Sequence, residues 1–127
     1  MRDTLKEPTT LSVSLEAAET LRQLQEAGLF QDKLDAYRFA LALALASGEE
    51  GARAKGERQT MFNRGTFDPD DTIYQAVLAL RTSTTDEPVY ETCQRLAEWG
   101  LEELRRRLVQ GPVHLAGILN EVIGAEK

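Results

Sequence analysis

The one cysteine and the one histidine limit the catalytic and metal chemistry that this chain of 127 residues can carry. Any Ser-His-Asp or Cys-His catalytic arrangement would have to use His114, which follows Pro112 at the start of an apolar final segment. Cys93 lies on the apolar face of a predicted helix, where a small buried hydrophobic residue is the simplest interpretation. One cysteine and one histidine also cannot supply four zinc ligands.

Paired carboxylates and glycines add no specific catalytic signal. Asp70-Asp71 and Glu102-Glu103 are adjacent pairs on predicted helices, so their side chains point in different directions and solvate the surface. The sequence has no Gly-x-Gly-x-x-Gly or Gly-x4-Gly-Lys-Ser/Thr loop for a nucleotide. We therefore expect a protein that is not an enzyme and that uses no metal or cofactor.

A basic run interrupts an otherwise acidic chain. The 15 lysines and arginines are outnumbered by 21 aspartates and glutamates, and this formal charge of -6 argues against a generally basic nucleic-acid-binding surface. Between residues 53 and 64 the balance reverses to +3, because Glu57 is the one acid among four basic residues: Arg53, Lys55, Arg58 and Arg64. Such a segment can contact phosphates without reading sequence. A solvated linker is the alternative interpretation.

Three elements are predicted near the amino terminus. Residues 10–15 alternate hydroxyl and branched apolar side chains, which is typical of a short half-buried strand. Ser14 is also placed to cap the following helix, so a capped extended lead-in is the alternative. Apolar residues recur at helical spacing over 16–27, and Gly28 suits the end of that helix. A second helix is predicted from Gln31 or Asp32 to Gly48.

This order of strand, helix, turn and helix resembles the ribbon-helix-helix unit of small bacterial repressors and antitoxins. Gly28-Leu29-Phe30 and the segment 35–41 also resemble the turn and second helix of those antitoxins. The resemblance implies that strands from two subunits pair as an antiparallel ribbon in the DNA major groove. Under it, one set of strand residues would face the bases: Thr10, Ser12 and Ser14. The alternate set would face a core shared by two subunits: Leu11, Val13 and Leu15.

Two departures from that family count against DNA binding by this unit. The base-facing set contains no arginine, lysine, asparagine or glutamine, the side chains best suited to bidentate base contacts. Asp32 stands where the family binds a DNA phosphate at the start of the second helix, and its charge would repel a phosphate. The same unit used for dimerisation alone is therefore a comparable alternative.

Three longer segments are similar to small proteins associated with bacterial DNA phosphorothioation systems: 28–43, 67–80 and 96–104. Such proteins are encoded beside sulfur-modification and restriction machinery that protects cells from phage. The resemblance implies an accessory role in DNA defence. It implies no reaction and no catalytic residue.

Four apolar or small residues on the predicted helices are candidates for an interface. Phe39 and Leu43 lie on a helix that is apolar on nearly all sides, which indicates either a central core helix or a subunit contact. Gly100 lies inside a helix, where it costs about 1 kcal/mol relative to alanine, so a second backbone is expected to approach it closely. Trp99 beside it can bury a large area. Packing within one monomer is the simpler explanation of the last pair.

Length and composition predict one mainly α domain of about five helices that opens with one short strand. We expect a mobile tail over 1–8, the ribbon-helix-helix-like unit over 9–47, a flexible basic loop over 48–67 and a helical part over 68–127.

The helical part has its own start and stop signals. A helix is predicted to begin with Asp68 as cap and Pro69 at its first position, and a long helix is predicted over 86–109. A short apolar helix follows Gly111-Pro112. Because no apolar signal core or membrane span is present, we expect a cytoplasmic protein, and the amino-terminal unit predicts a homodimer.

The leading functional hypothesis is a non-enzymatic accessory protein of a bacterial DNA-modification or anti-phage system that binds DNA or the protein components of such a system. One alternative is a ribbon-helix-helix transcriptional regulator or antitoxin-like repressor. Another is a protein-interaction module that does not bind DNA.

Overall fold

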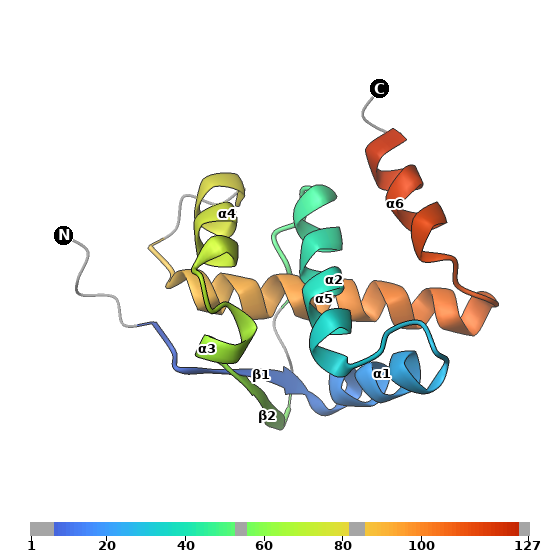
Figure 1. The fold of residues 1–127 in the computed structure, drawn as a ribbon, viewed down its shortest axis with the longest axis horizontal. Coiled ribbons are helices and arrows are strands. Elements are labelled where there is room, and N and C mark those ends of the chain that lie inside the picture. The colour runs from blue at the N-terminus through green and yellow to red at the C-terminus, as the bar shows by residue number, and fades with distance from the viewer. Residues whose placement is uncertain (1–6, 53–55, 82–85, 125–127) are drawn as a thin grey trace.

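The computed structural model describes residues 7–52, 56–81 and 86–124, and these residues form six helices and one two-stranded sheet. The elements follow in the order β1 (Thr10–Ser14), α1 (Leu15–Glu26), α2 (Lys33–Ala46), β2 (Arg58–Asn63), α3 (Arg64–Phe67), α4 (Thr72–Leu80), α5 (Val89–Gln110) and α6 (Leu115–Gly124) (Figure 1). The predicted mainly α fold with an opening strand is confirmed. In the described part of the chain, no helix is both long and apolar enough to cross a membrane.

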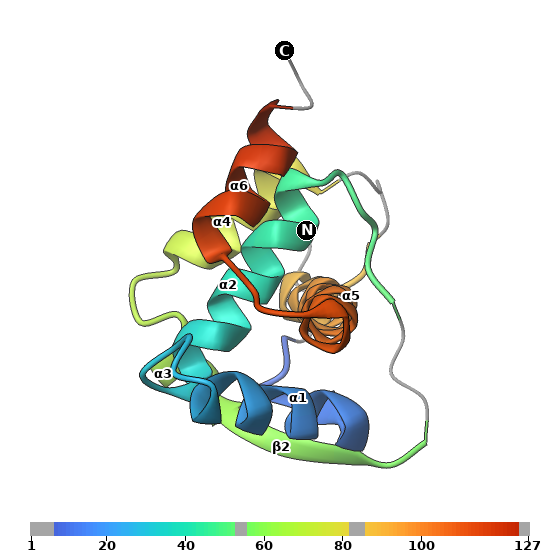
Figure 2. The ribbon, with the colours of Figure 1, turned by 90° about the vertical axis from the view of Figure 1, so that its right-hand side faces the viewer.

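The longest helix, α5, is the axis around which the other elements are arranged. In Figure 1, α4 and α6 lie on one side of α5, the sheet and α1 lie on the other, and α2 crosses it. Figure 2 looks along α5 and shows α1, α2 and α6 grouped around it. A Cβ atom built on Gly100 would lie 2.0 Å from the backbone oxygen of Ala40. The close backbone approach predicted at Gly100 is therefore confirmed, and the approaching backbone is this chain's own α2.

The core lies where β1, α1, α2 and α5 meet. Its fully buried side chains include Leu11, Val13, Leu21, Leu24, Tyr37, Leu43, Cys93, Leu96, Leu101 and Leu104. Leu11 and Val13 face inward as predicted. Leu15 does not join this core, because its side chain is 47% exposed in a single copy. Ser14 ends the strand and Leu15 is the first residue of α1, so the strand alternation no longer decides where its side chain points.

Helix ends follow the predicted caps in the first half of the chain. The Ser14 hydroxyl oxygen accepts a hydrogen bond from the backbone N–H of Ala17 at 3.0 Å, so Ser14 both ends β1 and caps α1. The Asp32 carboxylate accepts from the backbone N–H of Asp35 at 2.9 Å and caps α2. Gly28, with φ 77°, occupies the left-handed conformation that favours glycine after a helix.

β1 pairs antiparallel with β2 of the same chain, which corrects two expectations. The flexible loop predicted over 48–67 is wrong for its second half, because residues 58–67 form β2 and α3. The β2 sequence shows no clean alternation, since a bulge interrupts the ladder and the adjacent Met61 and Phe62 are both half-buried. The ribbon expected from the opening strands of two subunits is also wrong, because β1 pairs with β2 along one edge and donates to α5 side chains along the other.

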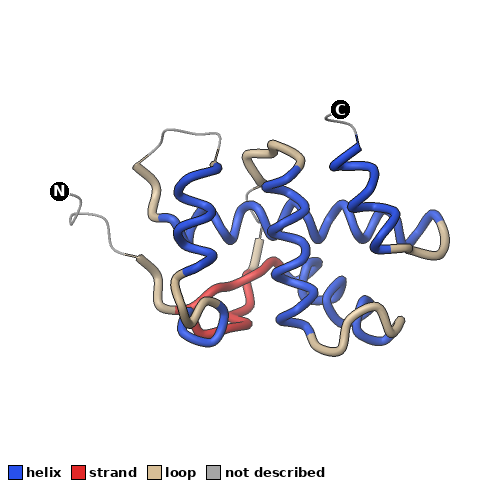
Figure 3. Tube along the Cα trace, turned by 45° about the horizontal axis from the view of Figure 1, so that its top comes forward, coloured by secondary structure: helices blue, strands red, loops and turns tan. Residues whose placement is uncertain are grey.

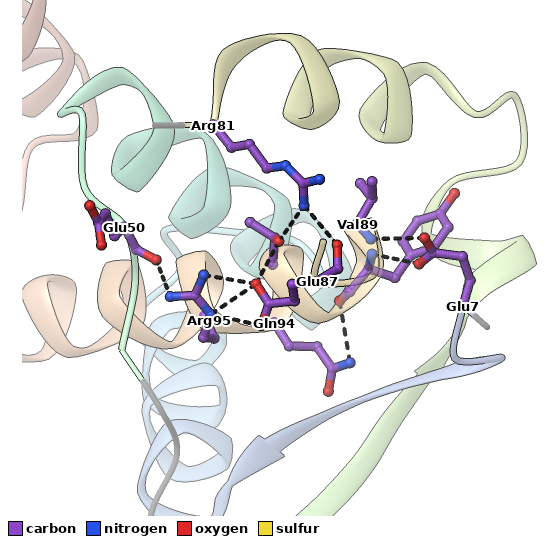
Figure 4. A network of polar contacts seen from close by, with 9 residues as sticks. Glu7, Glu50, Arg81, Glu87, Val89, Gln94 and Arg95 are labelled. Atoms are coloured by element: carbon purple, nitrogen blue, oxygen red, sulfur yellow. Dashed lines mark hydrogen bonds and ion pairs between the residues drawn. The ribbon is translucent and has the colours of Figure 1, made fainter. Parts of the chain in front are cut away.

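The first half of that predicted loop is held against α5. The backbone N–H of Ala52 donates to the backbone oxygen of Arg95 at 2.9 Å, and the Arg95 guanidinium donates to the backbone oxygen of Glu50. The same guanidinium forms an ion pair with Glu87 at 2.8 Å (Figure 4). These contacts hold residues 50–52 in place against α5. Residues 53–55 of the loop lie outside the described residues.

Glu7 corrects the predicted tail. Its carboxylate accepts hydrogen bonds from the backbone N–H groups of Val89 and Tyr90, each at 2.8 Å (Figure 4). Pro88 at the N-cap of α5 makes no side-chain cap, so Glu7 satisfies these two N–H groups from a distant part of the sequence. Residues 7 and 8 therefore belong to the folded domain, and the rest of the predicted tail, 1–6, lies outside the described residues.

The predicted start of the helix after Asp68, which is α4 in the structure, is also corrected. α4 begins at Thr72 rather than at Pro69, because Pro69 and Asp70 form a turn and Asp71 takes a left-handed conformation with φ 58°. The buried Asp68 still acts as the helix cap. Its carboxylate accepts from the backbone N–H groups of Ile73 at 3.0 Å and of Tyr74 at 2.8 Å.

Candidate functional site

The β1–β2 ribbon lies at the edge of the helical body (Figure 3). Residues that are directly opposite in an antiparallel pair have side chains on the same face of the sheet. The register places Thr10 opposite Asn63, Ser12 opposite Thr60 and Ser14 opposite Arg58. The face opposite the core therefore carries hydroxyl, amide and guanidinium groups. Its exposed members are Thr10, Arg58, Thr60 and Asn63.

Two of the three predicted base-facing residues are turned toward α5. The Ser12 hydroxyl and backbone N–H both donate to the Gln94 side-chain oxygen at 3.1 Å. Ser14 is 3% exposed, and its hydroxyl and backbone N–H both donate to the Glu98 carboxylate. The expectation that Ser12 and Ser14 contact bases is therefore wrong for a single copy of this chain, whereas Thr10 stays exposed. α5 takes the strand edge that a second subunit was expected to occupy.

Arg58 lies across this face and is exposed. Its Nε donates to the Ser12 hydroxyl oxygen at 2.8 Å, and its Nη2 donates to the Ser12 backbone oxygen at 3.0 Å and to the Gln94 side-chain oxygen at 3.1 Å. All three acceptors are neutral, so they orient the guanidinium without neutralising its charge. Five N–H donors leave capacity for an anion from solution.

Arg64 follows the other end of β2 as the first residue of α3. Its Nη1 donates to the backbone oxygen of Pro8 at 3.3 Å, and the guanidinium carbon lies 5.5 Å from the centre of the Tyr90 ring. A cation–π contact of this kind fixes the side chain while the charge persists. Arg58 and Arg64 are therefore held at the two ends of one strand, about 20 Å apart at the backbone.

These two arginines differ from most others in the described residues. Six arginines lie within 4.0 Å of a carboxylate oxygen: Arg22, Arg38, Arg95, Arg105, Arg106 and Arg107. Within the described ranges, neither Arg58 nor Arg64 makes such an ion pair, and both use uncharged partners instead. The strand between them therefore carries unneutralised positive charge in a chain whose formal charge is -6. Arg53 and Lys55, the other two predicted phosphate contacts, lie outside the described residues.

The predicted interface residues divide by burial within one copy. Leu11, Val13 and Leu43 are buried in the core, and Gly100 is covered by α2, so none of these four offers an exposed surface. The half-buried ones are Phe39 and Trp99. Phe39 packs against Phe30 with ring centres 5.5 Å apart, and Leu15 is exposed at the start of α1.

The groups with reactive side chains are shielded or isolated. Cys93 is buried as predicted, and burial raises the pKa of its thiol far above the ordinary value, so the nucleophilic thiolate is not formed near neutral pH. His114 is exposed and lines a pocket at the turn between α5 and α6, in which Arg107 pairs with Glu121 at 3.0 Å. Among the described residues no three metal-ligating side chains gather into a cluster.

Sequence reasoning missed β2 and the two α5 side chains that cover β1. Gln94 and Glu98 are four residues apart and thus lie on one face of α5. That spacing was visible in the sequence, but polar residues at helical spacing normally indicate a solvent face. The pairing of β2 depends on a contact between segments about 50 residues apart, for which the sequence carried no local signal.

Comparisons of this chain with protein-family models, with curated proteins and with solved structures give no match.

Proposed function

We propose that this protein acts by binding rather than by catalysis, and that the β1–β2 ribbon contacts the phosphate backbone of DNA. The observation that carries the proposal is that Arg58 and Arg64, at the two ends of β2, form no ion pair with a carboxylate, while the exposed side chains between them are polar. A span of about 20 Å corresponds to roughly six base-pair steps along the axis of a DNA duplex. Contacts of this type bind DNA with little sequence preference.

The amides and hydroxyls between the two arginines support the same proposal. Thr60 and Asn63 are exposed on the same face as Arg58 and can donate hydrogen bonds to phosphate oxygens. The acidic remainder of the chain favours a local contact over wrapping of the duplex.

The experiment is a titration of a fluorescein-labelled DNA duplex of random sequence, followed by fluorescence anisotropy at low salt. The test variant combines Arg58→Gln with Arg64→Gln. The control combines Arg105→Gln with Arg106→Gln, which removes the same charge from arginines that are paired with glutamates on α5. We expect roughly tenfold weaker binding for the test variant and near-unchanged binding for the control. Equal weakening of DNA binding in both variants would mean that net charge alone explains the effect. An unmodified protein that does not bind DNA would refute the proposal.

For the cellular role we propose an accessory protein of a bacterial DNA-modification or anti-phage system. This rests on the similarity of segments 28–43, 67–80 and 96–104 to proteins associated with DNA phosphorothioation. Deleting the gene in its host tests the role by two readouts, the phosphorothioate content of the DNA and the efficiency of phage plating. An unchanged value of both would refute it while leaving DNA binding in vitro intact.

A protein-binding function is favoured by one separate observation. α4 contains no charged residue, and the side chains of Leu78 and Leu80 are 46% and 63% exposed. Exposed apolar side chains of this kind are typical of contacts with other proteins. The variant Leu78→Gln with Leu80→Gln should lower retention on a hydrophobic-interaction column while leaving DNA binding unchanged. A loss of DNA binding in this variant would mean that α4 and the β1–β2 ribbon belong to one DNA-binding surface.

A further inference from the structure

Among the described residues, the outer edge of β2 has no strand or side chain bonded to it, whereas α5 side chains bond the outer edge of β1. The sheet has two strands, so β2 has a partner on one side only. In an antiparallel ladder, residues alternate between pairs that exchange hydrogen bonds and pairs that point their backbone groups outward. Ser12 and Ser14 point their N–H groups toward α5, so their partners on β2 also point away from β1. Thr60 and Arg58 therefore direct their N–H and C=O groups at the free edge.

We propose that this edge binds the same edge of a second copy of the chain, which gives a four-stranded antiparallel sheet in the order β1-β2-β2-β1. A free strand edge is a template for another strand, and twofold-symmetric pairing is the commonest form of self-association. The residues at the edge, Arg58 to Thr60, are all exposed and none is proline. This dimer does not depend on whether the ribbon binds DNA.

The direction of the backbone groups selects one register. If the twofold axis passes through Gln59, Arg58 of each copy lies opposite Thr60 of the other, and both pairs exchange their outward N–H and C=O groups. An axis at Arg58 would place two arginines directly opposite each other, which is destabilising. An axis at Thr60 would pair Arg58 with Phe62, whose backbone groups already face Leu11 of β1. The twofold axis of the dimer is therefore placed at Gln59, where the backbone groups of the two β2 edges match.

The side chains agree with that register. The two Gln59 side chains would lie directly opposite each other in a non-hydrogen-bonded pair, with Cα atoms about 4.5 Å apart, and two amides can donate to and accept from each other. Arg58 would lie beside Thr60 of the second copy rather than beside another charge. The outer polar faces of both ribbons would then form one surface carrying Arg58 and Arg64 from each copy.

The first experiment is light scattering coupled to size-exclusion chromatography, without DNA, over a range of protein concentrations. We expect a dimer of the unmodified protein that dissociates on dilution. Gln59→Lys would place two ammonium groups opposite each other and should give a monomer. Asn63→Lys adds the same charge to β2 beyond the bulge and should leave the dimer intact. A monomer at all concentrations, or a dimer that Gln59→Lys leaves unchanged, would overturn the proposal.

A cross-link tests the register itself. In a Cys93→Ala background, Gln59→Cys should form a covalent dimer under mild oxidation, because a non-hydrogen-bonded pair brings two cysteines within disulfide distance. Asn63→Cys in the same background should remain a monomer on a non-reducing gel. A dimer in which Asn63→Cys cross-links and Gln59→Cys does not would show a different interface. Circular dichroism confirms that each variant is folded.

Discussion

Two buried tyrosines differ in whether their hydroxyl group has a hydrogen-bond partner. Tyr37 is fully buried, and within the described chain its hydroxyl oxygen has no hydrogen-bond partner. The Tyr90 hydroxyl is buried as well, but it donates to the Asp68 carboxylate at 2.8 Å. Burial raises the pKa of both phenols, and the Asp68 carboxylate raises that of Tyr90 further. Both rings contact Phe67, so their apolar surroundings are similar.

The same substitution should therefore have opposite effects at the two positions. Tyr37→Phe removes an unpaired buried hydroxyl and should raise the free energy of unfolding by about 1 kcal/mol. Tyr90→Phe leaves Asp68 without one of its donors and should lower the free energy of unfolding by about 1–3 kcal/mol. Urea unfolding followed by circular dichroism measures both values. A loss of stability in Tyr37→Phe would mean that its hydroxyl has a partner.

Alkaline pH should destabilise the fold through Cys93. Burial raises the thiol pKa in the folded state, whereas an unfolded cysteine ionises at about pH 8.5. Above that pH the unfolded state releases a proton that the folded state keeps, so stability is full below about pH 8.5 and falls as pH rises toward the folded pKa. The slope is about 1.4 kcal/mol per pH unit for one group. Urea midpoints between pH 8 and pH 10 measure it, and Cys93→Ala should remove this part of the slope; an identical slope in that variant would exclude the thiol.

At the scale of elements, the crossing of α2 over α5 depends on one missing side chain. A Cβ atom on Gly100 would lie 2.0 Å from the backbone oxygen and 2.5 Å from the backbone carbon of Ala40. Backbone atoms cannot move aside as a flexible side chain can, so Gly100→Ala should lower the free energy of unfolding by at least about 3 kcal/mol. Gly65→Ala is the control, because nothing lies within 4 Å of its Cβ position. Thermal unfolding that ranks the two variants equally would place the helices farther apart.

The elements also show which parts of the fold local sequence can specify. Ser14, Gly28 and Asp32 act through neighbours within a few residues, and their roles as caps or stops could be predicted. Gly100 was predictable because a glycine is costly inside a helix unless a neighbour needs the space. The strand β2 was not, because its pairing and its bulge depend on β1 far away in the sequence.

The candidate site was predictable in composition but not in arrangement. Arg58 and Arg64 were correctly located on a locally basic segment, yet they lie on a strand and at the start of a helix rather than in a loop. Ser12 and Ser14 were placed on a strand, but Gln94 and Glu98 from α5 occupy their hydrogen-bonding groups. Contacts between elements therefore decided which of the predicted polar residues stayed accessible.

At the scale of the whole molecule, one short basic segment stands out in an acidic chain. The formal charge of -6 should repel DNA over most of the surface, and the basic segment 53–64 offers a small attractive region. The dependence of DNA affinity on salt then reports how many phosphates are contacted, because the logarithm of the binding constant falls by about 0.9 per contact for each decade of salt. The slope of this salt dependence therefore measures the number of phosphate contacts independently of the affinity at any single salt concentration.

Four contacts from one copy, through Arg53, Lys55, Arg58 and Arg64, predict a slope of about -3.6, and two copies on one duplex predict about -7. Replacing Arg58 and Arg64 by glutamine should make the slope less negative by about 1.8 per bound copy. Combined with Gln59→Lys, the measurement separates the two proposals, since a monomer that keeps its ribbon should bind with the smaller slope. A slope that stays the same in the glutamine variant would place the phosphate contacts on another part of the molecule.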